Sequence, residues 1–268
     1  MIIVKEFPDR KFETKDELFT ALRENKADLI ATKKMQLKQA DSVFQVTPDV
    51  IKTDSTKAEE QTQENVNRLK AELVINTTNI MDSHSDVHLK GIWNKTVKEQ
   101  KNLYLLQEHK MTFDHIISDN VSAKVVEMKW SDLGFNYKGM TEALIFDATI
   151  DKGRNPFMFE QYSKGYVKEH SVGMRYTKLE LAINSENKYD KEEKEVWDKY
   201  FDQIVNKEQA EEQGYFWAVQ EAKVIEGSAV VKGSNHATPT ISVEAVKDTP
   251  TTEPTEVTQT IKRKLSVI

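Results

Sequence analysis

The sequence predicts an α+β protein in which a mostly antiparallel sheet or small β-barrel is ringed by helices and preceded by a helical N-terminal arm. Two observations support this class. From Lys70 onward, short apolar segments of strand-like composition alternate with polar connections. Two helix-like segments interrupt those strands, and a charged, helix-like region comes before them.

The composition excludes several classes of protein. The chain has 268 residues with 38 basic and 44 acidic side chains, a formal charge of −6. This balance does not fit a nucleic-acid binder that works by bulk positive charge, and no apolar run approaches the roughly 18 residues of a membrane helix. Cysteine is absent, which excludes disulfides, thiolate metal sites and a cysteine nucleophile. The N-terminal segment has no signal-peptide pattern, so we expect a cytoplasmic protein without nucleic-acid or membrane partners.

Residues 1–40 are predicted to form the helical arm. Thr14 and Glu17 have the spacing of a capping box, and Leu18 and Leu22 begin an intermittent apolar stripe. Charged residues of both signs surround the stripe, which indicates a solvated helix or helix pair. Ser, Thr, Gln, Glu and Lys dominate residues 41–69, which we interpret as a polar linker. We expect both segments to be mobile and dispensable for the stability of the core.

Strands and helices alternate in the central part of the chain. Strands are predicted at 71–75, 103–106, 123–128, 141–148, 172–183, 216–219 and 222–225. One helix is predicted from Asn155 to about Glu169, because Pro156 occupies the favoured first turn. A second is predicted within Lys191–Glu212, where apolar side chains recur at helical spacing and indicate core packing.

Residues 234–268 are rich in Thr, Pro, Val and Glu, and we expect them to be a disordered tail. The tail ends in a basic and apolar peptide, 261–268. This peptide fits either a docking segment or a loose solubilising end.

The first candidate for chemistry is a histidine pair. His84 and His88 are four residues apart, with Asp82 and Asp86 nearby, and on a helix they could bind a metal. The segment has poor helix propensity, which favours a surface loop without metal.

His109 and Ser171 are the other candidates. His109 follows the strand at 103–106, where a histidine could act as a general base or could be structural. Ser171 enters a strand two residues before Gly173, and that glycine would let backbone N–H groups approach a developing oxyanion. A turn serine is the alternative interpretation.

Taken in order, four blocks resemble the prohead maturation proteases of tailed bacteriophages, which are serine proteases related in fold to the herpesvirus assemblins. The blocks are Asp82–Trp93, Leu105–His109, His170–Tyr176 and Val224–Val231. They are similar, respectively, to the family's early Asp- and Gly-containing segment, its catalytic-histidine segment, its nucleophile segment and its Glu-Val-Ser-Leu-Val strand. The chain departs from the pattern at Ser85, at His170 and at Lys232-Gly233-Ser234. The resemblance covers residues 70–233 and implies an assemblin-like protease domain there.

The resemblance implies a catalytic set of Ser171 as nucleophile, His109 as base and Glu226 as the group that orients the imidazole. His170, His115 or another acid are the alternatives for the third role. His170 is disfavoured because neighbours on an extended chain point to opposite faces. We therefore expect His109 within hydrogen-bond reach of Ser171, with Glu226 on the other ring nitrogen.

The function implied by the resemblance is a serine endopeptidase that processes capsid or scaffold protein during phage prohead maturation, with autocatalytic self-cleavage. Its partners would be the major capsid protein or the scaffold protein, and its place the assembling prohead in the bacterial cytoplasm. Assemblins are activated by dimerising, so a homodimer is also implied, and no metal or organic cofactor is. The alternative is a catalytically silent scaffolding or capsid-binding protein.

Overall fold

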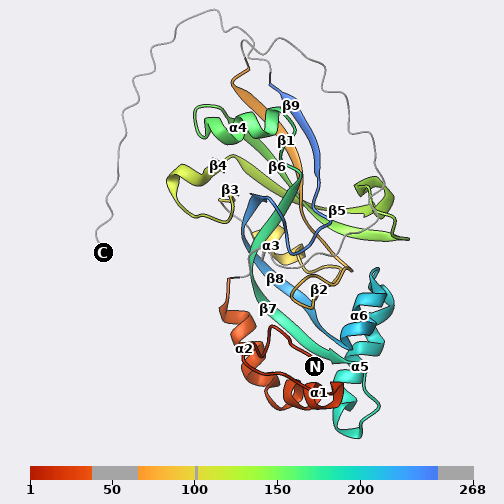
Figure 1. The fold of residues 1–268 in the computed structure, drawn as a ribbon. Helices are drawn as coiled ribbons and strands as arrows, with labels where there is room; N and C mark the ends of the chain where they lie inside the picture. The colour runs from red at the N-terminus through yellow and green to blue at the C-terminus, as the bar shows by residue number, and fades with distance from the viewer. Residues whose placement is uncertain (38–65, 100–101, 247–268) are drawn as a thin grey trace, which may run out of the picture.

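The computed structural model describes residues 1–37, 66–99 and 102–246 (Figure 1). The α-helices are α1 (Lys15–Glu24), α2 (Lys26–Met35), α3 (Asn94–Glu99), α4 (Pro156–Ser163), α5 (Lys191–Tyr200) and α6 (Lys207–Gln213). The strands are β1 (Arg68–Thr77), β2 (Asp86–His88), β3 (Leu105–Gln107), β4 (Ile116–Ser118), β5 (Val121–Lys129), β6 (Met140–Asp151), β7 (Glu169–Ile183), β8 (Tyr215–Val230) and β9 (Thr240–Ala245).

The strands form two open sheets. One has the order β5-β6-β1-β9 and is antiparallel throughout. In the other, β8 pairs antiparallel with β7 on one side and parallel with β2 and then β3 on the other, and β4 follows β3. The predicted α+β class with mostly antiparallel strands is therefore confirmed. The predicted closed barrel is wrong for the described residues, because each sheet keeps two edges.

The main core lies between the two sheets. Leu73 and Phe146 from β1 and β6 belong to the same buried cluster as Leu181 and Val219 from β7 and β8. These apolar side chains alternate along their strands with residues on the other face, so the facing surfaces of the two sheets can cover each other. A barrel is not needed to bury them.

Two predicted element boundaries are wrong. The helix that begins at Pro156 ends at Ser163 instead of Glu169, and Gly165 follows with a φ of +65°, a conformation that closes a helix. The strands predicted at 216–219 and 222–225 are one continuous strand, β8. The partly exposed Gln220 and Glu221 between them made the sequence look interrupted.

The N-terminal arm is helical, as predicted, but it is not a loose appendage. Thr14 caps α1 by accepting the Glu17 N–H at 3.2 Å. Leu18 and Leu22 are fully buried in the main core cluster. Figure 1 shows α1 and α2 at the lower end of β7 and β8. The expectation that this segment is mobile and dispensable is wrong for residues 1–37, because its short apolar stripe is covered by the sheet.

The C-terminal part of the fold extends beyond the predicted boundary at 234. Asn235, Ala237 and Thr238 are buried, and β9 pairs with β1. The predicted tail is thus wrong for residues 234–246. Residues 247–268, with the basic and apolar peptide, and most of the predicted linker lie outside the described residues. Among the described residues, no helix is both long enough and apolar enough to cross a membrane.

Candidate active site

Strand β8 is the centre of the site, because it lies between β7 and β3. Ser228 is opposite Ser171 of β7 on one side and opposite Leu106 of β3 on the other. Glu226 is opposite Gly173. Direct cross-strand partners share a face of an antiparallel pair, and so do residues two apart on one strand. Ser171, Gly173, Glu226 and Ser228 therefore face the same side.

A tight turn after β3 brings His109 back over β8. The Lys110 N–H donates to the Gln107 carbonyl at 3.1 Å, and the two central residues, Glu108 and His109, have φ values of 51° and 57°. Positive φ at both central positions is typical of a type I′ turn, which prefers Asn and Gly. Two non-glycine residues in this region store strain of the kind found at functional sites.

The histidine contacts the carboxylate predicted for it. His109 Nδ1 lies 2.6 Å from Glu226 Oε1, and both side chains are buried almost completely. Because an ionised carboxylate can only accept, the Nδ1 atom donates, which leaves Nε2 as the other ring position. The predicted contact between His109 and Glu226 is confirmed.

Ser228 closes a ring of contacts with this pair. Its hydroxyl donates to Glu226 Oε2 at 2.6 Å and accepts the backbone N–H of His109 at 3.1 Å. Both carboxylate oxygens of Glu226 are thus bound, one by the ring and one by the serine. Ser228 was not among the predicted site residues, although the Glu-x-Ser spacing within a strand places both side chains on one face.

Gly173 makes room for the carboxylate. A Cβ atom added to this residue would lie 1.9 Å from Glu226 Oε1 and 2.7 Å from its Cδ. No side chain can occupy that position while Glu226 keeps its place. Gly173 was predicted to let backbone N–H groups approach an oxyanion, whereas the structure gives it a steric role beside Glu226.

Ser171 lies in the strand next to the His109–Glu226 pair. It faces Ser228, and directly opposed residues have Cβ atoms about 4.5–5.5 Å apart. The side chain is close to fully buried, with the residue 6% exposed. None of the hydrogen bonds between described residues joins Ser171 to His109, so the predicted contact that a triad requires is not seen.

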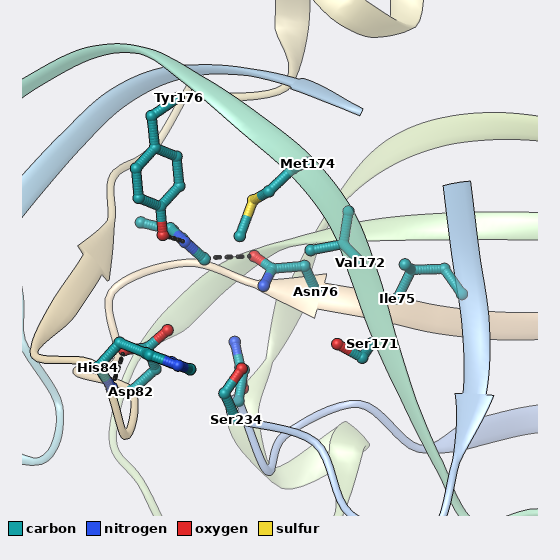
Figure 2. Close-up of a pocket in the computed structure, with 11 residues that line it drawn as sticks. Ile75, Asn76, Asp82, His84, Ser171, Val172, Met174, Tyr176 and Ser234 are labelled. Atoms are coloured by element: carbon teal, nitrogen blue, oxygen red, sulfur yellow. Dashed lines mark hydrogen bonds between the residues drawn. The ribbon is translucent and has the colours of Figure 1, made fainter. Parts of the chain in front are cut away.

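Ser171 also lines a small cavity, which Figure 2 shows between β7, the end of β1 and the loop at 82–85. Its volume is about 10 Å³. This is space for about one water molecule, too little for a substrate side chain. Ser234 and Asn235, which follow β8, close one side of the cavity.

The alternative orienting residues are engaged elsewhere. The fully buried ring of His170 donates from Nδ1 to the Thr238 carbonyl at 3.1 Å and accepts the Tyr162 hydroxyl at 3.0 Å. Burial lowers the pKa of His170 to about 4. His115 contacts Thr112 Oγ1 at 2.8 Å on the surface. Neither of these residues is in a contact with His109 that would orient its ring toward Ser171.

The His84–His88 segment is not a helix. Residues 82–85 form a turn in which Asp82 Oδ1 accepts the backbone N–H groups of His84 and Asp86 at 2.8 and 3.0 Å. The predicted loop is confirmed at residues 82–85, but the prediction that His88 lies on the surface is wrong. It lies in β2, buried between Asn76 Oδ1 and the Tyr176 hydroxyl, each at 3.1 Å. The described part of the chain contains no cluster of three or more His, Cys, Asp or Glu side chains suited to a metal.

A buried network of charged side chains attaches the N-terminal arm to the sheet, close to the cavity that Ser171 lines. Lys33 Nζ donates to Asp86 Oδ1 at 2.6 Å and lies 3.6 Å from Glu6 Oε1, and the Tyr176 hydroxyl donates to Asp86 Oδ2 at 2.7 Å. Burial opposes the charge of Lys33, but Asp86 and Glu6 outweigh it and raise its pKa above the usual value. This network was not predicted, because charged residues on a short helix are usually solvated.

Comparisons of the chain with protein-family models, with curated proteins and with solved structures found no match.

Proposed function

We propose that this protein is a serine endopeptidase of the prohead-maturation type, with Ser171, His109 and Glu226 as its catalytic set. The contact between His109 Nδ1 and Glu226 Oε1 at 2.6 Å is the observation that carries the proposal. The position of Ser171 on the adjacent strand, on the face of Glu226, supports it. The four sequence blocks support the choice of family and an assemblin-like relationship.

In the proposed mechanism, Ser171 Oγ attacks the scissile carbonyl carbon of a peptide. His109 Nε2 takes the hydroxyl proton as the C–O bond forms, and then gives that proton to the leaving amine as the C–N bond breaks. Glu226 holds Nδ1–H and stabilises the imidazolium that forms between these steps. Its complete burial strengthens this interaction, because the local dielectric constant is low. A water molecule then hydrolyses the acyl-enzyme. His109 Nε2 takes a proton from the water as it attacks the acyl carbon, and gives that proton to Ser171 Oγ as the ester bond breaks.

The proposed substrates are the major capsid protein or the scaffold protein within an assembling prohead, together with the protease itself. The proposed protease acts as a homodimer, as the assemblins do. The mechanism requires no metal or organic cofactor, since Ser171 is activated by a histidine and a carboxylate.

The test uses a fluorophosphonate probe, which labels activated serines covalently, together with intact-mass measurement of self-cleavage. Wild type should be labelled at Ser171 and should process itself. Ser171→Ala should lose both, since removal of a triad nucleophile costs about a million-fold in rate. The matched control is Ser122→Ala, an exposed serine on β5 whose loss should change neither readout.

Processing by Ser171→Ala would refute the assignment of Ser171. A folded wild type that is neither labelled nor cleaved would refute the protease and favour the non-catalytic scaffolding or capsid-binding protein.

A further inference from the structure

The hydroxyl of Ser228 connects the two residues that the proposed mechanism places behind Ser171. It is fully buried on the central strand β8, opposite the nucleophile's own position on β7. It lies 2.6 Å from Glu226 Oε2 and 3.1 Å from the backbone nitrogen of His109. No other hydroxyl among the described contacts touches both residues.

The chemistry of these groups fixes the direction of each hydrogen bond. A backbone N–H can only donate and an ionised carboxylate can only accept, whereas a serine hydroxyl does both. The His109 N–H must therefore donate to Ser228, and Ser228 must donate to Glu226. The remaining carboxylate oxygen, Oε1, then accepts the Nδ1–H of the same histidine. The result is a closed ring in which each proton has one position.

The closed ring of hydrogen bonds constrains the backbone of His109 and the carboxylate of Glu226. His109 lies in a turn with positive φ, where its backbone conformation is unfavourable and needs an anchor. Glu226 could rotate about its last bond, and binding both oxygens prevents this. A buried serine that only satisfied its own polarity would need one partner, whereas Ser228 binds the base and its orienting group together.

We propose that Ser228 is a positioning residue: it anchors the backbone of His109 and the carboxylate of Glu226, so that the ring keeps Nδ1–H toward Glu226 and presents Nε2 toward Ser171. This inference rests on the proposed function for its catalytic consequence. Its structural part, the tautomer and orientation of His109, holds independently of any activity.

The variants are Ser228→Ala, which removes the hydroxyl, and Ser228→Thr, which keeps it. Ser118→Ala is the matched control, because Ser118 is also buried and donates its hydroxyl to the Thr149 carbonyl at 2.6 Å. The first measurement is the ¹⁵N spectrum of the histidine rings, which distinguishes the two tautomers. The second is the rate of fluorophosphonate labelling of Ser171 as a function of pH.

In wild type, Ser228→Thr and Ser118→Ala we expect the Nδ1–H tautomer at His109. Ser228→Ala should show a mixture of tautomers, a labelling rate about 10- to 100-fold lower, as for the outer partners of metal-bound histidines, and a shifted pH profile. Recovery by Ser228→Thr would support the positioning role. If the threonine variant does not fold, the alanine variant and its control still decide the question.

The inference is overturned if Ser228→Ala keeps the wild-type tautomer at His109, or if its labelling rate and pH profile match those of Ser118→Ala. If wild type is not labelled at all, the proposed function fails, while the tautomer measurement still confirms or refutes the positioning of His109 by Ser228.

Discussion

Replacing Gly173 by alanine tests the geometry of the site directly. The new methyl group would lie 1.9 Å from Glu226 Oε1, and Cβ contacts under 3.0 Å are essentially never seen. The carboxylate must therefore retreat by about 1 Å or more, which disturbs its 2.6 Å contact with His109 Nδ1. Since Glu226 is fully buried, it cannot escape to solvent.

The expected cost follows from what the carboxylate loses. Hydrogen bonds to charged groups contribute about 1.5–3 kcal/mol each, and overpacking a buried site costs about 1–3 kcal/mol. We expect Gly173→Ala to lower the free energy of unfolding by about 3 kcal/mol, with partial relaxation included. For a chain of this size that corresponds to a fall in melting temperature of about 6–12 °C.

The assay is thermal and urea unfolding of a double-mutant cycle with Glu226→Ala. Removing the carboxylate removes the clash, so Gly173→Ala should cost less than about 1 kcal/mol in that background. Gly153→Ala is the control, since its nearest neighbour is Asp151 Oδ1 at 3.1 Å, the end of an exposed side chain. Equal costs of Gly173→Ala with and without Glu226 would refute the reasoning.

Two further predictions concern buried groups away from the site. Lys33→Met removes the cation that binds Oδ1 of buried Asp86 and should destabilise the fold by about 3–5 kcal/mol in urea unfolding. Lys90→Met, which removes only an exposed ion pair, should change little, and equal effects of the two substitutions would contradict the buried network. Burial lowers the pKa of His170 from 6.5 to about 4, so the unfolded chain takes up a proton first as pH falls. Wild type should therefore lose about 3 kcal/mol of unfolding free energy between pH 6.5 and 4. His170→Asn, which can still donate to Thr238, should lose much less. If the unfolding free energy of both proteins falls equally with pH, His170 is not responsible for the loss.

The sequence could predict the parts of the structure that depend on local pattern. The alternation along 172–183 and 141–148 correctly indicated strands, and the Thr14 cap correctly began a helix. The contact between His109 and Glu226 was predicted from the order of the blocks, and it required only that their strands be neighbours. Ser228 could have been found by the same reasoning, because two-residue spacing on a strand fixes its face.

Other features depend on pairing between distant segments and could not be read locally. Lys33 and Asp86 look like surface charges until α2 packs on β7 and the Lys33 ammonium meets Asp86 of β2. β9 was taken for a tail because Thr and Pro dominate its surroundings, although Ile241, Val243 and Ala245 alternate as a strand requires. The choice between a closed barrel and two open sheets depends on which edges meet, and no periodicity encodes that choice.

Strand β8 connects the arm and the candidate site. Near its start, Trp217 donates from Nε1 to Glu6 Oε1 at 2.8 Å, and Lys33 lies over its ring. Near its end, Glu226 holds His109, about 30 Å away along an extended strand. Between these two points, Tyr176 binds Asp86, lines the cavity beside Ser171 and is opposite Ala222 of β8. The pairs that β8 makes with β3 and β7 hold the second region in register, so loosening the arm should weaken the fold without moving the histidine from its carboxylate.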